Sequence, residues 1–155
     1  MKNMQLYRLV YYSEATPELG LDDVARIAEK SSRNNRRRCL TGSLLYCEGK
    51  FLQTLEGGIR QINDLYRKIM IDPRHINVSL IEFSPIQKRA FETWDMSLVF
   101  FPSSQEFLEE YVKYSHVTEF DPMYLSGGAC TDLLKELLQK RRHVTHLADL
   151  QRKSG

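Results

Sequence analysis

Hydrophobic residues recur with two alternating periods along the first 101 residues of the chain. Short β-branched or aromatic runs that alternate by twos predict strands, and apolar residues three and four positions apart predict helices. Glu48 and Gly49 mark a tight hairpin turn, and Asp72 with Pro73 ends the second helical pattern. The predicted order is strand, helix, strand, strand, helix, strand, strand, over residues 6–13, 21–35, 39–57 for the hairpin, 59–71, 77–86 and 91–101.

This order of elements predicts the fold class. The first six elements match a split βαβ, ferredoxin-like arrangement, an α+β fold in which two helices cover one face of a mixed sheet. The strand over 91–101 is an addition, so the full pattern is βαββαββ. Because both crossovers are expected to be right-handed, the first and third strands should lie side by side in the sheet centre. The second face of the sheet then needs another cover.

The chain changes character after "FPSSQ", residues 101–105. Two amphipathic helices are predicted over 106–115 and 129–142, and a polar tail follows them. The second of these helices has an apolar stripe, too small to form a core alone, made of Cys130, Leu133, Leu134, Leu137 and Leu138. The stripe must pack on the open sheet face or on a partner. We therefore expect a domain over 1–101 and a C-terminal helical extension with its tail over 102–155.

Composition narrows the class of protein only a little. The 155 residues are 42% hydrophobic and 27% charged, which is ordinary for one globular domain, and the net charge of +2 does not indicate nucleic acid. No apolar run approaches the about 20 residues that span a bilayer, and no signal-peptide core follows the N-terminus. These features predict a cytoplasmic protein with neither a membrane nor a nucleic-acid partner.

The residue types that most often carry chemistry lack the spacing for it. Three cysteines, Cys39, Cys47 and Cys130, have no CxxC spacing and are predicted to be small reduced hydrophobes. The histidines show neither a nucleophile and base arrangement nor metal-ligand spacing; they are His75, His116, His143 and His146. A small hydrolase is therefore disfavoured, and we expect no metal and no enzymatic activity.

A polar residue on an apolar strand face raises a question of binding. In "FLQTLEGG" Gln53 shares its face with Phe51 and Leu55, and burying its amide unpaired would cost about 1 to 3 kcal/mol. The predicted sheet brings Gln53 near Tyr11, and Asn35 extends the apolar face of the first helix. Singly, each has an ordinary explanation, as a core tyrosine, a backbone-bonded glutamine or a helix-end asparagine.

Together, these three side chains are predicted to converge on one gap between the helices and the sheet. A flat ligand with an apolar body and an amide-like edge would satisfy all of them, and the isoalloxazine ring of a flavin has that form. Gln53 and Asn35 would bond its carbonyl and ring nitrogens, while Ile27 and Ile69 would sandwich it from the two helices.

Four stretches of the chain resemble one known family. "LYRLVYYS", "SSRNNRRRCLTGSLLYCEGKFLQTLEG", "LYRKIMIDPRH" and "FETWDMSL" are similar, in order and spacing, to the motifs of the BLUF family of blue-light sensors that use FAD. The resemblance covers about residues 5 to 100 and implies that 1–101 is a BLUF flavin-binding domain. The region with "YVKYS" and "DPMYLSGG" resembles the short, stand-alone, PixD-like type.

The resemblance implies roles for individual residues. Tyr11 looks like the photoactive tyrosine of the family and Gln53 like its switching glutamine. Asn35 looks like the residue that holds the flavin carbonyl edge, with Asn34 beside it. The fifth-strand pair whose exchange between inward and outward positions has been proposed as the signalling step corresponds to Trp94 and Met96, which on the residues alone would be ordinary core.

Three further residues occupy positions where the family contacts the ribityl and phosphate portion of FAD or caps the pocket. They are Lys68, Asp72 and His75. The family often has arginine at the first of these positions. Lysine keeps the charge but lacks the bidentate fork, so the phosphate contact is expected to be looser.

The implied activity is light sensing rather than catalysis of a conversion. Light-driven electron and proton transfer from Tyr11 and a rearrangement of Gln53 would shift the flavin absorption to longer wavelength and alter protein–protein interactions. We expect a homo-oligomer and a light-dependent partner protein, for which a response-regulator-like protein is a candidate. The Leu133 to Leu138 stripe and the fifth strand are the expected output surfaces.

One alternative of a different class is a ferredoxin-like RNA-binding module, which would display aromatic residues on open strands near basic residues. "NNRRR", with Tyr7 or Tyr12, gives it slight support. It predicts a colourless protein with salt-dependent RNA affinity. "QKRRH", residues 139–143, could also contact nucleic acid, but cations at a helix C-terminus are favoured by the helix dipole without any ligand.

Overall fold

The strand order of the central sheet confirms the predicted fold class. The computed structural model describes residues 5–91, 96–101, 104–116 and 118–141. The five-stranded sheet has the order β4-β1-β3-β2-β5, in which β1 and β3 are central as predicted. The first four strands pair antiparallel and β5 pairs parallel with β2, so the sheet is mixed. The elements are β1 Leu6–Ala15, α1 Leu21–Arg37, β2 Thr41–Cys47, β3 Lys50–Gly58, α2 Ile59–Ile71, β4 His75–Ile86, β5 Met96–Phe101, α3 Ser104–Tyr111, the short 3-10 helix η1 Pro122–Tyr124 and α4 Gly127–Arg141.

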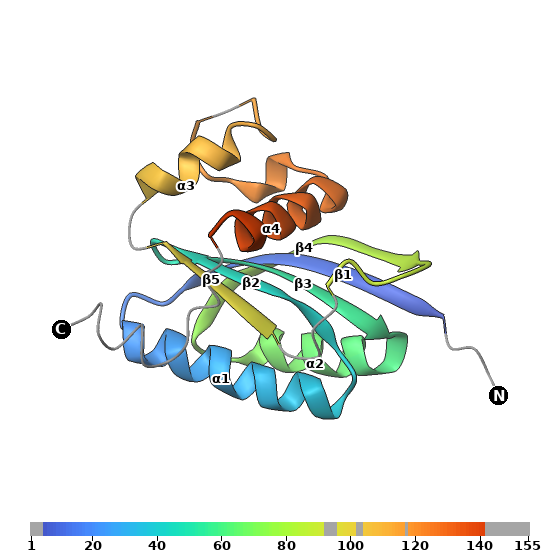
Figure 1. Ribbon diagram of the computed structural model, residues 1–155. Helices are drawn as coiled ribbons and strands as arrows, with labels where there is room; N and C mark the ends of the chain where they lie inside the picture. The colour runs from blue at the N-terminus through green and yellow to red at the C-terminus, as the bar shows by residue number, and fades with distance from the viewer. Residues whose placement is uncertain (1–4, 92–95, 102–103, 117, 142–155) are drawn as a thin grey trace.

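Helices cover both faces of this sheet (Figure 1). Helices α1 and α2 lie against one face, and α3 and α4 lie over the other. Alternation along β1 divides its side chains between two cores: Leu9 and Tyr11 belong to the core beneath α1 and α2, and Val10 belongs to the core beneath α4. The architecture is therefore three layers, with the central strands buried on both sides.

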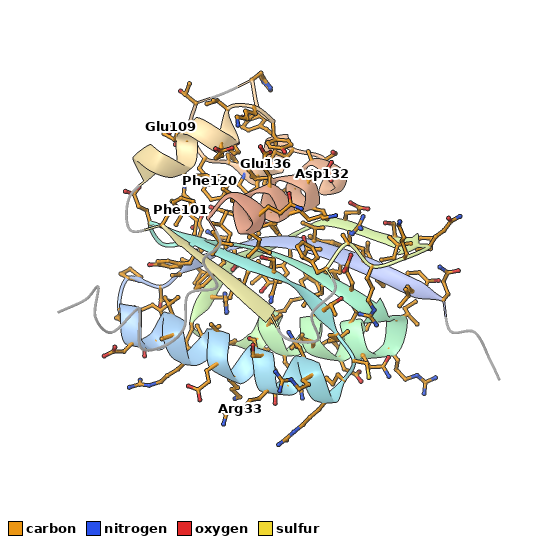
Figure 2. The ribbon with its side chains drawn as sticks, viewed as in Figure 1. Arg33, Phe101, Glu109, Phe120, Asp132 and Glu136 are labelled. Carbon is orange, nitrogen blue, oxygen red and sulfur yellow. The ribbon has the colours of Figure 1, made fainter. Side chains whose placement is uncertain are left out.

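The apolar stripe of α4 packs on the sheet face that the first two helices leave open. Its side chains Cys130, Leu133, Leu134 and Leu137 are buried in one core with Leu45 and Leu52 of the sheet, and Leu138 packs against that core. Aromatic rings extend the same core towards α3: Phe107 lies 5.4 Å from Phe101 and 4.5 Å from Phe120 between ring centroids (Figure 2 labels Phe101 and Phe120). Of the two predicted uses of the stripe, the structure shows packing on the sheet.

Truncating this contact should therefore destabilise the whole domain. Leu134 has no exposed surface, so Leu134→Ala removes buried methyl groups and leaves a cavity, which is expected to lower the free energy of unfolding by about 2 to 5 kcal/mol. Urea denaturation of the FAD-loaded protein measures this. Val112→Ala is the control, because that side chain is 45% exposed and should cost little. Equal losses in both variants would show that α4 contributes no buried packing.

Several element boundaries differ from those predicted by one to five residues, and the largest difference is at β5, which begins at Met96 and not at 91. Helix α1 continues to Arg37, so Asn35 lies within its last turn and not at its end; cations there are favoured by the helix dipole. Strand β4 begins at His75 and not at 77, and α3 ends at Tyr111 where a turn follows. Among the described residues no helix is both long enough and apolar enough to cross a membrane.

The three cysteines are not all buried hydrophobes. Cys47 and Cys130 are buried, as predicted, whereas Cys39 is exposed in the turn between α1 and β2. Its backbone has a φ of 57°, and this turn reverses the chain from the helix into the sheet. For Cys39 the local turn geometry outweighs the preference of a small thiol for the interior.

Candidate functional site

A cavity of about 120 Å³ lies between the two first helices and the central strands. Its walls come from β1, β2, β3, α1, α2 and the residues that follow α2, so the fold itself brings these distant parts of the chain together. Many of the residues predicted from the sequence line it, namely Tyr11, Ile27, Asn34, Gln53, Lys68, Ile69, Asp72 and His75. Of the three polar side chains predicted to converge on one gap, Tyr11 and Gln53 line this cavity and Asn35 does not.

The polar pair in the cavity wall comes from the two central strands. Tyr11 and Gln53 are directly opposite each other in the antiparallel register of β1 and β3. Both side chains are buried, and the Tyr11 hydroxyl donates a hydrogen bond to Oε1 of Gln53. Burial raises the pKa of Tyr11 above its ordinary value, since the phenolate would be poorly solvated there. Tyr11 is thus a neutral hydrogen-bond donor, and Gln53 accepts a hydrogen bond from it through Oε1.

Asn35 is a fully buried amide without a partner among the described residues. Its exposed fraction is 0%, and neither Nδ2 nor Oδ1 makes a hydrogen bond. It does not line the cavity itself; the neighbouring Asn34 does. Leaving such an amide unpaired costs about 1 to 3 kcal/mol, and unpaired buried groups of this kind are uncommon. The side chain of Asn35 therefore has unused hydrogen-bonding capacity inside the protein.

The end of α2 forms the charged side of the cavity. Asp72 is the C-cap residue of this helix. Its carboxylate accepts hydrogen bonds from the Arg74 guanidinium, from Nε to Oδ1 at 3.0 Å and from Nη2 to Oδ2 at 2.7 Å. These hydrogen bonds lower the pKa of Asp72, so the carboxylate is ionised and occupied by Arg74. Lys30 and Lys68 also line the cavity, and neither has an ion pair with a described residue. The cavity wall therefore carries two cations available to an anionic ligand.

His75 lies at the start of β4, where its ring is held from two sides. Its Nδ1 is 2.9 Å from the Ser13 hydroxyl, and its ring centroid is 4.9 Å from that of Phe51. Burial lowers the pKa of the imidazole, since the charged form would lose solvation. His75 is consequently a neutral polar wall of the cavity at neutral pH.

Some residues that line the cavity were not predicted from the sequence. Leu44 and Leu65 are apolar at strand and helix spacing, and a search for core positions near Gln53 would have found them. Arg74 was signalled only by its place two residues after Asp72. Lys30 lies one turn before Asn34 on α1, and that spacing is the signal that could have found it.

The predicted pair on the fifth strand is only partly within the described structure. Trp94 lies outside the described residues. Met96 begins β5 and lies opposite Gly42 of β2 in the parallel register. Their roles stay predictions.

The fold is a ferredoxin-like sheet of the α+β class, with a cavity beneath its first two helices. Side-chain amides and lysines line this cavity, which is typical of a domain that binds a small molecule. Residues 6–97 match the family model described as "Sensors of blue-light using FAD", and the chain belongs to this BLUF family. The resemblance noted from its motifs is confirmed, and so is FAD as the cofactor of the family. The relatives described next give no support to the RNA-binding alternative.

The similar proteins include both large and small members of the family. The photoactivated adenylate cyclase subunit beta of Euglena longa is 37% identical over 135 residues, which cover 79% of this chain and 16% of that protein. Among solved structures, the dark state of BlrB, a BLUF protein, has a TM-score of 0.71 at 28% identity, covering 89% of this chain and 98% of that one. The photo-activated state of BlsA has a TM-score of 0.75 at 27% identity, covering 86% and 94%. The chain thus spans about a sixth of the cyclase relative.

Proposed function

We propose that this protein senses blue light through FAD bound between α1, α2 and the sheet, and that Tyr11 and Gln53 convert absorption into a new hydrogen-bond pattern. The observation that carries the proposal is the buried Tyr11 to Gln53 hydrogen bond in the wall of a cavity. A tyrosine paired with a ligand-facing amide can lose an electron and a proton and leave its partner to rearrange. The family assignment supports the cofactor.

The residues present fit a flavin. The unpaired amide of Asn35 and the adjacent amide of Asn34 offer donors and acceptors for the polar edge of the ring system. Ile27 from α1 and Ile69 from α2 provide apolar contacts on the two sides of the cavity. Lys68 and Lys30 provide cations for the phosphate portion, and Lys68 does so without the fork that an arginine would have.

FAD, when bound, supplies blue-light absorption and a strong electron acceptor in its excited state. Tyr11 would act as the electron donor: its raised pKa keeps the hydroxyl protonated in the dark, and its hydrogen bond to Gln53 Oε1 would lead the proton through the amide towards the cofactor that takes the electron. Once Tyr11 has lost its proton, its oxygen can only accept a hydrogen bond. Oε1 of Gln53 then faces an acceptor, so rotation or tautomerisation of the amide becomes favourable.

The rearranged amide would store the signal after the electron and the proton have both returned to Tyr11. A donor from Gln53 directed at the cofactor would strengthen a hydrogen bond there and shift absorption to longer wavelength. The protein itself need perform no chemical conversion. Its output would be a change in affinity for another protein, for which a response-regulator-like protein is a candidate, or for a second copy of the chain.

The two surfaces expected to contact a partner, the α4 stripe and β5, differ in accessibility. The Leu133 to Leu138 stripe is buried against the sheet, so a partner could use it only after α4 moves. Strand β5 lies at the edge of the sheet order, where a further strand could pair with it. We therefore place the first contact of a partner at β5.

An absorption spectrum tests the proposed function directly. The purified protein is loaded with FAD in the dark, and its spectrum is recorded before and after a flash of blue light. Flavin bands should move to longer wavelength after the flash and return in the dark. A protein that cannot take up FAD, or one whose bands do not move, would overturn the proposal.

Replacing Asn35 should separate its cost to the fold from its use to the ligand. In Asn35→Leu the unpaired amide is gone, so the free energy of unfolding of the apoprotein should stay equal or rise by about 1 kcal/mol. The same change should weaken FAD binding by roughly tenfold or more, because the ligand loses its hydrogen-bond partner. Thermal unfolding and fluorescence titration with FAD measure the two effects.

A matched control lies on α2. Unlike the buried and unpaired amide of Asn35, the amide of Asn63 already donates to the Ile59 carbonyl of its own helix at 2.8 Å, so Asn63→Leu should leave FAD affinity unchanged. An Asn35→Leu variant that binds FAD as tightly as the wild type would remove Asn35 from the site.

A further inference from the structure

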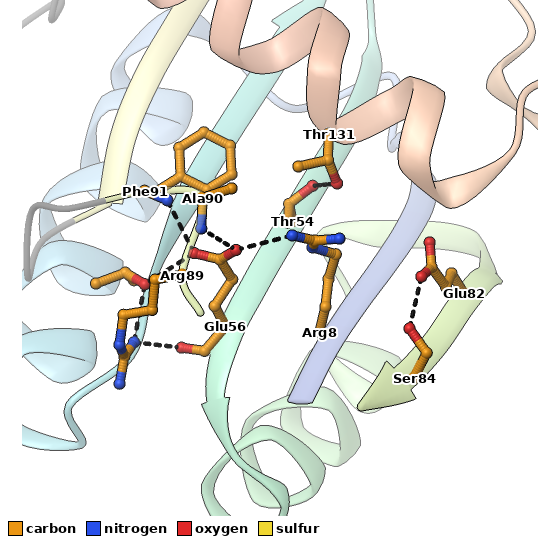
Figure 3. A network of polar contacts seen from close by, with 10 residues as sticks. Arg8, Thr54, Glu56, Glu82, Ser84, Arg89, Ala90, Phe91 and Thr131 are labelled. Carbon is orange, nitrogen blue, oxygen red and sulfur yellow. Dashed lines mark hydrogen bonds and ion pairs between the residues drawn. The ribbon is translucent and has the colours of Figure 1, made fainter. Parts of the chain in front are cut away.

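Glu56 is a fully buried carboxylate on β3 that no step of the proposed photochemistry uses. Its Oε1 accepts hydrogen bonds from the Thr41 hydroxyl at 3.1 Å and the backbone N–H of Phe91 at 3.0 Å. Its Oε2 accepts from the backbone N–H of Ala90 at 2.8 Å and forms an ion pair with Arg8 at 3.3 Å. Figure 3 shows these contacts converging on one side chain. An anion of this kind is tolerated in the interior only because all its partners are in place.

The partners of Glu56 tie three strands to a loop. Arg8 on β1 and Thr41 on β2 are both directly opposite Glu56 in the sheet register. Ala90 and Phe91 belong to the connection that leaves β4 and precedes β5. The carboxylate therefore joins the centre of the sheet to the segment 89–91, which is distant from it in the sequence.

Arg89 reinforces the same attachment from the loop side. Its Nη1 donates to the Glu56 carbonyl at 2.9 Å and to the Thr41 hydroxyl at 2.8 Å, and its Nη2 donates to the Cys39 carbonyl at 2.9 Å. Segment 89–91 is thus held through side-chain and backbone groups of Glu56 at once. Hydrogen bonds to charged groups are about twice as strong as neutral ones, so this attachment should follow the position of β3 closely.

Glu56 lies three residues after Gln53 on the same strand. Because side chains alternate along a strand, Gln53 points into the cavity beneath α1 and α2, while Glu56 points to the opposite face of the sheet. Three residues of strand span about 10 Å. A displacement of β3 caused by new hydrogen bonds at Gln53 therefore reaches Glu56 through an extended backbone already paired on both sides.

We propose that Glu56 is a positioning residue that transmits a light-driven displacement of β3 to segment 89–91 and hence to the start of β5. This inference rests on the proposed function, because it assigns the route by which the Gln53 rearrangement leaves the flavin side. The carboxylate holds the Ala90 and Phe91 N–H groups in the dark. In the lit state the displaced strand lengthens these two bonds and loosens the segment.

The test compares hydrogen–deuterium exchange of segment 87–91 in the dark and under blue light, in the FAD-loaded full chain. In the wild type, exchange should be faster under light. In Glu56→Gln one of the two carboxylate oxygens becomes an NH₂ group, which cannot accept the hydrogen bond of the backbone N–H that faces it. Exchange of the segment's backbone amides in the dark should then already be roughly tenfold faster than in the wild type, and the light–dark difference should disappear. The shift of flavin absorption should be retained, because Tyr11 and Gln53 are untouched.

Two further variants keep the test independent of any folding defect. Glu82→Gln is the matched control. Glu82 is a half-buried carboxylate on β4 that accepts a hydrogen bond from Ser84, and among the described residues it has no hydrogen bond or ion pair with 89–91, so the light–dark difference of the variant should equal that of the wild type. Arg89→Ala removes the loop-side contacts but leaves Glu56 in place, so it should reduce the light–dark difference without reducing the flavin shift.

The possible results separate the two proposals. A wild type that shows no flavin shift would overturn the proposed function and this inference together. A normal flavin shift with the same light–dark difference in Glu56→Gln as in the wild type would overturn the role of Glu56 alone. A wild type with a flavin shift but equal exchange of segment 87–91 in dark and light would do the same.

Discussion

Replacing Gln53 by leucine is expected to leave the protein yellow and to abolish the movement of its absorption bands after blue light. Leucine fills a similar volume, so the cavity and its apolar contacts should persist and FAD should still bind. The hydrogen bond that Gln53 accepts from Tyr11 is lost, and with it the amide that can exchange a donor for an acceptor. Absorption spectra before and after a flash measure the effect.

A second glutamine provides the control for this variant. Gln61 lies on α2 and does not line the cavity, so Gln61→Leu makes the same chemical change away from the cofactor. It should show a normal shift. If Gln53→Leu shifted as the wild type does, the switching role of Gln53 would be wrong.

Replacing Tyr11 by phenylalanine should abolish the light reaction with FAD still bound. The ring can keep its packing, including the contact with Tyr66 at 5.7 Å between centroids, so only the hydroxyl is lost. Without that hydroxyl there is no proton to give and no donor for Gln53. The lost hydrogen bond should cost about 1 kcal/mol of unfolding free energy. Flash absorption and chemical denaturation measure the two effects.

Tyr66 is the matched control for Tyr11. It is a residue of α2 whose ring contacts that of Tyr11, and burial raises the pKa of its hydroxyl too. Tyr66→Phe removes a hydroxyl that is not bonded to Gln53 and should retain the absorption shift. A normal photoreaction in Tyr11→Phe, or its loss in Tyr66→Phe, would assign the electron donor to a different residue.

Local periodicity was enough to predict the centre of the site. Alternation by twos put Tyr11 and Gln53 on helix-facing sides of their strands, and handedness put those strands side by side. Ile69 follows the helical spacing of α2 and lines the cavity, as does Ile27 of α1, which was predicted to face it across the ligand. These residues follow regular elements, for which sequence pattern and position in space are tightly linked.

Prediction failed where position depends on an irregular segment or on a distant partner. The helical spacing put Asn35 on the apolar face of its helix, and the structure buries it there, but its side chain is unpaired and does not line the cavity. Arg74 reaches back to Asp72 from an irregular connection, which no hydrophobic period describes. Glu56 was visible as a charge in a strand, but its partners at 89–91 are more than 30 positions away.

Two consecutive residues of β3 face the two opposite sides of the sheet. Gln53 belongs to the cavity beneath α1 and α2, and the very next residue, Thr54, faces α4, where its hydroxyl lies 3.4 Å from that of Thr131. Helices α3 and α4 therefore also keep this sheet face from solvent: without them Val10 and the apolar side chains around it would be exposed. Any protein that displaced α4 would have to cover this sheet face with an apolar surface of its own.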